Sequence, residues 1–152
     1  MVKQYKPEKK DRNPNTLHPD DIRHFIWDRS VEDNSIELDL SFSDEEIHNA
    51  FRHMALSFNA IEPFVVSISA DATPYNMWAI HGTIYHLLLS KYHKETRNDL
   101  TYEAGGITTD VQKTLIKHLQ EQIKVHKEEF YRLAKAEKIN ININEAFRPG
   151  IG

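Results

Sequence analysis

The chain has no cysteine, and only five of its 152 residues are glycine. Without cysteine it can form neither a disulfide nor a thiolate metal site, which is typical of proteins of a reducing compartment. No apolar run approaches the roughly 18 residues that cross a membrane, and the N-terminus lacks the apolar stretch of a secretory signal. The formal net charge is −4, whereas dedicated nucleic-acid-binding domains carry a basic excess. We therefore expect no membrane contact and no dedicated nucleic-acid binding.

Motifs of the common enzyme classes are also absent. No Gly-x-Ser-x-Gly elbow is present, and Gly105-Gly106 is not followed by the lysine of a phosphate-binding loop. The histidine pairs His48/His53 and His81/His86 are each five residues apart. Five residues turn a helix through about 500°, so neither pair shares a face. We predict that the protein is not an enzyme and holds no metal or cofactor.

His81 and His86 lie inside a strongly apolar segment. Two interpretations are open for them. They are either buried neutral imidazoles with hydrogen-bonded partners, or histidines at a subunit contact whose titration makes assembly sensitive to pH.

The composition that remains, 39% hydrophobic and 28% charged, predicts one domain with a small core and much surface for solvent or partners. The pattern is mainly α, a small bundle of about four helices. Pro19 is suited to the first turn of a helix whose buried stripe is Ile22, Phe25 and Ile26. Ser43 and Glu46 form the capping box of a second helix that ends before Pro63.

The second helix buries the apolar face Ile47, Phe51, Met54, Ala55 and Phe58. Residues 36–42 alternate between apolar and polar and predict an extended segment, and residues 64–68 predict a short strand or an extended linker. A third helix, apolar nearly all round, runs from Thr73-Pro74 to about Tyr92, with Gly82 allowing close approach of another helix.

The fourth helix is the longest, from about Thr109-Asp110 to about Lys138, or roughly 40 Å. Its inward stripe is Val111, Leu115, Leu119, Ile123, His126, Phe130 and Leu133. Because this length exceeds what a small domain needs, we expect its far end to project.

Both ends of the chain differ from this helical domain. We divide the chain into an extended basic arm at residues 1–17, a helical domain at residues 18–138, and an extended tail at residues 139–152. The arm is either a disordered tail or a segment that orders on a neighbouring subunit. The tail repeats Ile-Asn from Ile139 to Asn144, a strand-like pattern. It either pairs with the sheet edge of another chain or packs back on its own domain.

Arg97–Gly106 joins the third helix to the fourth in this interpretation. Asn98 and Asp99 favour an Asx turn, Tyr102 can pin a loop to the core, and Gly105-Gly106 permits unusual backbone angles. The segment predicts a rigid hinge between two helices or a surface shaped for a partner, and the two are compatible.

Four stretches together resemble small virion proteins of tailed bacteriophages, of the head–tail connector or neck (adaptor) type. They are DIRHFIWDR at residues 21–29, LSFSDEEI at 40–47, FNAIEP at 58–63 and RNDLTYEAGG at 97–106. They occur in this order within residues 20–138. The resemblance implies a mostly helical subunit of a ring, often of twelve copies, docked beneath the portal. It brings no catalytic residues.

From the resemblance we expect a homo-oligomeric ring in the neck of the virion, assembled in the host cytoplasm. Its partners would be the portal and other neck or tail proteins, with non-specific contact to packaged DNA. The alternatives are another virion component, such as a collar, tail-completion or baseplate protein, or a cytosolic helical module that binds nucleic acid through the basic arm. The predicted contact residues are Lys9, Lys10, Arg12, Trp27, Arg97, Asn98, Tyr102, Gly105, Gly106, Ile139, Ile141, Ile143, Phe147 and Arg148.

Overall fold

The computed structural model describes residues 13–26, 42–104 and 110–148, with side chains at 13–26, 42–97 and 113–148. Its helices are α1 (Pro19–Phe25), α2 (Asp44–Asn59), α3 (Met77–Ala104) and α4 (Asp110–Ala146), with the 3-10 turn η1 (Ala70–Ala72) before α3. The described residues contain no strand, only an isolated bridge between Thr16 and Pro74. The predicted mainly α bundle with a long C-terminal helix is therefore confirmed.

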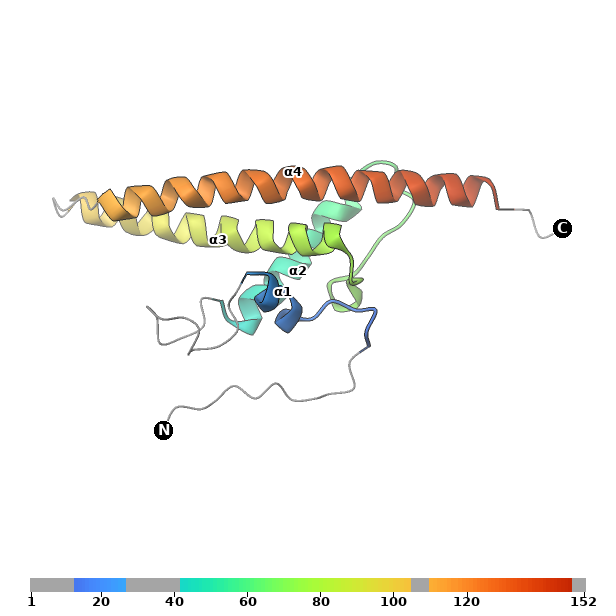
Figure 1. Cartoon of the computed structure of the whole chain (residues 1–152), viewed down its shortest axis with the longest axis horizontal. Helices are drawn as coiled ribbons and strands as arrows, with labels where there is room; N and C mark the ends of the chain where they lie inside the picture. The colour runs from blue at the N-terminus through green and yellow to red at the C-terminus, as the bar shows by residue number, and fades with distance from the viewer. Residues whose placement is uncertain (1–12, 27–41, 105–109, 149–152) are drawn as a thin grey trace, which may run out of the picture.

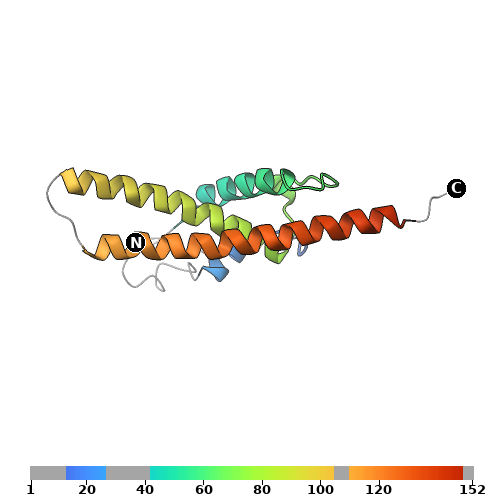
Figure 2. The same cartoon turned by 90° about the horizontal axis from the view of Figure 1, so that it is seen from above.

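The two longest helices determine the shape of the molecule. α3 and α4 run antiparallel side by side along the length of α3, while α1 and α2 lie on one side of α3 (Figure 1). Seen from above, α2 and α4 flank α3, and the end of α4 extends beyond all other helices (Figure 2). We use the term body for α1, α2 and η1 together with the parts of α3 and α4 that pack on them.

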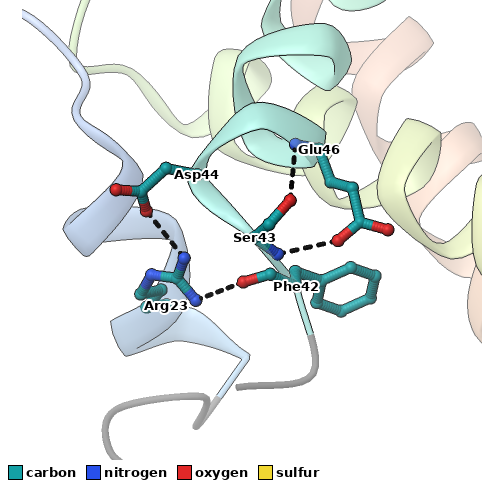
Figure 3. Close-up of polar contacts among 5 residues, drawn as sticks. All are labelled: Arg23, Phe42, Ser43, Asp44 and Glu46. Atoms are coloured by element: carbon teal, nitrogen blue, oxygen red, sulfur yellow. Dashed lines mark hydrogen bonds and ion pairs between the residues drawn. The ribbon is translucent and has the colours of Figure 1, made fainter. Parts of the chain in front are cut away.

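Paired side chains fix the start of α2 and hold α1 against it. Ser43 accepts a hydrogen bond from the Glu46 backbone N–H, and the Ser43 N–H donates to the Glu46 carboxylate at 2.7 Å, which confirms the predicted capping box. Arg23 of α1 is buried and donates to the Phe42 carbonyl at 2.6 Å and to Asp44 at 2.7 Å (Figure 3). The guanidinium thereby holds α1 against the first turn of α2.

The core lies where α2 crosses α3 and α4. All five residues of the predicted apolar face of α2 are buried. A Cβ atom built on Gly82 would lie 2.6 Å from both Met54 Cγ and Phe130 Cδ2, so only glycine fits where the three helices meet. The predicted close approach at Gly82 is thus confirmed. Two residues that were predicted to face the core do not do so, since Phe25 is 39% exposed and Leu115 is 37% exposed.

Residues around Leu17 belong to the body and not to the predicted arm. Leu17 is buried in the core, its N–H donates to the Thr73 carbonyl, and the Tyr75 N–H donates to the Asn15 carbonyl. Burial of one apolar side chain and two backbone hydrogen bonds offset the conformational entropy lost when these residues become ordered. Residues 64–68 form neither a helix nor a strand, as in the linker interpretation.

Helix α3 is longer than predicted. It begins at Met77, after Thr73-Pro74, and continues through Arg97–Ala104, where we expected a shaped connection. A helix already nucleated gains one backbone hydrogen bond per added residue, and no glycine or proline interrupts the chain between Gly82 and Gly105. The turn preference of Asn98 and Asp99 does not outweigh this gain.

The predicted strand-like tail is likewise wrong. Ile139–Asn144 lies within α4, which continues to Ala146. Alternation alone cannot form a strand without a partner, whereas a helix satisfies its backbone groups internally. Among the described residues, no helix is long and apolar enough to span a membrane.

Candidate subunit-contact surface on helix α4

The predicted contact residues fall into three groups in the structure. Lys9, Lys10, Arg12, Trp27, Gly105 and Gly106 lie outside the described residues. Arg97, Asn98 and Tyr102 belong to α3, and the side chain of Arg97 is exposed. Ile139, Ile141 and Ile143 lie in α4, with Phe147 and Arg148 directly after it. Only this last group comes together on one element with its side chains described.

The end of α4 presents apolar side chains to solvent. Ile139, Ile143 and Phe147, four residues apart, are 43%, 48% and 82% exposed. At about 100° per residue, positions i, i+4 and i+8 lie along one side of a helix. We call these three residues the terminal stripe. Ile139 and Ile143 lie in the last turns of α4 and Phe147 directly follows it; this end of α4 extends beyond α3 (Figure 1).

Lys138 anchors α4 immediately before the terminal stripe. The residue is fully buried, and its ammonium donates to the Ile61 carbonyl at 2.7 Å, just past the end of α2. The same nitrogen lies 4.7 Å from the Phe58 ring centroid and 6.0 Å from that of Phe64. Burial lowers the pKa of Lys138, and the aromatic faces and the carbonyl offset part of the cost of burying its charge.

The sequence contained a signal for this anchor that we did not use. Lys138 follows Phe130 and Ala134 at four-residue intervals, so it continues the buried side of α4. Ile141, three residues further on, is half-buried and is the last residue of α4 to face the body. Ile141 therefore does not belong to the exposed terminal stripe, although we predicted it as a contact residue.

Two histidine pairs bridge the helices. His81 of α3 and His126 of α4 approach to 3.0 Å between their Nδ1 atoms, and the His53 and His86 rings stack at 5.7 Å between α2 and α3. Ser57 Oγ lies 3.0 Å from His86 Nε2. The position of His126 on the predicted inner stripe of the fourth helix was the signal for the first pair.

Burial favours the neutral form of these rings. It lowers the pKa of His86 to about 4, assisted by the charge of His53. Burial is also the main cause of the lowered pKa values of His81 and His126. Nearby, the exposed Arg132 forms an ion pair with Glu129, which lowers the pKa of that carboxyl, and Glu129 acts against the effect of burial on His81. No group of three or more potential metal ligands gathers anywhere in the described part of the chain.

Comparison of the chain with known protein families, characterised proteins and solved structures finds no match. The assignment of a function therefore depends on the residues and geometry described above.

Proposed function

We propose that the chain is a structural subunit of a tailed-phage virion, a ring-forming head–tail connector of the neck (adaptor) type that joins the portal to the tail. Its partners are other copies of itself, the portal and further neck or tail proteins, with non-specific contact to packaged DNA. The sequence resemblance supplies the identity of the assembly. The end of α4 supplies a surface that fits a subunit contact.

The terminal stripe is the observation that carries the proposal. Burying one isoleucine or phenylalanine side chain stabilises a contact by roughly 1.5–3 kcal/mol. Three such side chains lie exposed at the end of a helix that Lys138 holds in place, and among the described residues only Ile141 is half-buried beyond that anchor. A partner that covers the stripe gains this burial without having to order the helix first, which favours assembly.

The distribution of charge is also that of an interface. In a chain with 28% charged residues, none occurs between Lys138 and Glu145. Interface cores are depleted of charged residues, because each charge that is buried without a partner opposes association. The uncharged, apolar end of α4 therefore has the composition of a surface that becomes covered.

A variant of the terminal stripe tests the proposal. Purified protein is mixed with portal rings and examined by electron microscopy with symmetry averaging. We expect a ring of the protein on the portal, and we expect the double variant Ile139→Asp, Ile143→Asp to reduce its occupancy at least tenfold.

Val125→Asp serves as the matched control, since Val125 is also an exposed apolar residue of α4, at 57%, but lies before the projecting end. It should assemble normally. A wild-type chain that stays monomeric in the presence of the portal would contradict the proposed function.

A further inference from the structure

The exposed side of the α4 end forms a regular seam. Ala136, Ile139, Ile143 and Ala146 follow one another at intervals of three, four and three residues, and all four are exposed. Alternating steps of three and four place side chains in one line, and this is the spacing with which two helices pack along each other. We call these four residues the outer seam.

The outer seam points away from the body. Ala134 and Lys138 are buried and Ile141 is half-buried, and these three positions lie on the opposite side of the helix at about 100° per residue. The outer seam is therefore open to a second helix on the side of α4 that faces away from the body.

The order of residues in the seam is the same in both directions. Ile139 and Ile143 lie two residues on either side of position 141, and Ala136 and Ala146 lie five residues on either side of it. An antiparallel second copy centred on that position would place isoleucine against isoleucine and alanine against alanine.

The flanks of the seam are self-complementary too. Asn140 and Asn142 lie beside it and are exposed. Each asparagine amide both donates and accepts, so each can hydrogen-bond to its own counterpart across a two-fold axis. The absence of charge between Lys138 and Glu145 removes the like-charge repulsion that commonly opposes self-pairing.

We propose that, in the free protein, two copies pair antiparallel through the outer seam, about a two-fold axis at position 141. The proposal rests on the proposed role of the α4 end as a subunit contact. A two-fold contact is not among the head-to-tail contacts that close a ring. The pair must therefore separate before the terminal stripe contacts a ring neighbour or the portal.

The length of the seam makes this separation easy. From Ala136 to Ala146, ten steps along the helix, the rise is only about 15 Å. Such a contact buries far less than the roughly 1,200 Å² of a stable interface, so we expect the pair to form only at high protein concentration and to separate on dilution. The pair therefore protects the apolar surface at high concentration and releases it when a larger interface is offered.

Disulfide cross-linking tests the direction of pairing, and the lack of native cysteine means that no other thiol competes. Ile139→Cys and Ile143→Cys variants, one carrying a mass tag, are mixed at high concentration and oxidised mildly. Antiparallel pairing places position 139 against position 143 of the second copy. Random pairing would make half of all disulfides mixed, that is, between the two different variants. We expect the mixed disulfide to exceed this share. Each variant alone should cross-link several times more slowly.

Leu56→Cys gives the collision rate, because Leu56 is an exposed apolar residue of α2 at 67%. The proposed pairing would be overturned if the mixture cross-links no faster than this control. It would also be overturned if the self-linked and mixed products form in equal amounts. Ring formation on the portal by the unmodified protein would then still stand, so a failure of the pairing is distinct from a failure of the proposed function.

Discussion

Phe130 and Phe147 lie on the same stretch of chain, seventeen positions apart, but their surroundings are opposite. Phe130 is fully buried among α2, α3 and α4, whereas Phe147 is 82% exposed at the end of α4. Lys138 is the last buried residue of α4, and among the described apolar residues after it only Ile141 is half-buried. The buried apolar side chains stabilise the fold, and the exposed ones of the terminal stripe are available to partners.

Removing each phenylalanine ring in turn is the strongest test of this difference. We expect Phe130→Ala to lower the free energy of unfolding by about 3–5 kcal/mol, because it leaves a cavity at the centre of the core. Phe147→Ala should change it by less than about 0.5 kcal/mol. Urea denaturation of both variants measures the effect, and equal losses would show that the end of α4 packs on the body.

A methyl group added at the helix crossing tests how closely the body is packed. Gly82→Ala places a Cβ atom against Met54 and Phe130, and we expect a loss of about 1–3 kcal/mol from overpacking. Alanine is the better helix former by up to about 1 kcal/mol. A stabilised variant in thermal or urea denaturation would therefore mean that the neighbouring side chains move aside freely.

Acid should lower the free energy of unfolding of the body and leave pairing through the outer seam unaffected. The pKa of His86 in the folded chain, about 4, is below its ordinary value of 6.5, so the unfolded chain binds the proton first. The stability contributed by the neutral ring is present above pH 6.5 and is lost as pH falls from there towards 4. The full pKa shift of His86 corresponds to roughly 3 kcal/mol of unfolding free energy. Because the ring is partly exposed, we expect a loss of about 1–2 kcal/mol.

Urea denaturation at pH 7 and at pH 5 measures this loss in the wild-type chain and in His86→Gln. The variant should lose less stability between the two pH values than the wild type does. His118→Gln, at an exposed position of α4, is the control and should retain the wild-type dependence. An unchanged dependence in His86→Gln would assign the acid sensitivity to other groups.

The smallest effect is expected at the asparagines of the projecting end. Asparagine is a weaker helix former than alanine by roughly half a kcal/mol, so Asn140→Ala and Asn142→Ala should slow hydrogen exchange of the amides after Ile139. The global free energy of unfolding should stay within about 0.5 kcal/mol, because this end opens independently of the body. Slower exchange throughout the body would mean that the two regions unfold together.

Local chemistry made several features predictable. Pro19 at the start of α1, the capping box of Ser43 and Glu46, and the buried face of α2 depend on neighbours within one or two helical turns. Such patterns keep the same meaning in any fold. The requirement for a small residue at Gly82 was also predictable, because a strongly apolar helix must meet others closely.

The errors concern segments whose state depends on distant residues. Arg97–Ala104 contains turn formers, and Ile139–Asn144 has the alternation of a strand, yet both are helical. In each case the preceding helix continues, because neither segment contains a glycine or a proline. Lys138 was missed for a related reason, since a lysine is buried only where a carbonyl and aromatic rings from another element receive it.

The sequence by itself determined that the chain is mainly helical, where α1 and α2 begin, and that its last stretch carries isoleucines without charge. These properties follow from backbone preferences and from the periodicity of apolar residues. The tertiary structure decided that this stretch is a helix, which of its sides faces the body, and that Ile139, Ile143 and Phe147 are exposed. It did so because Lys138 is fixed at the end of α2, 77 positions from the Ile61 carbonyl that it binds, and no local pattern encodes a contact over that separation.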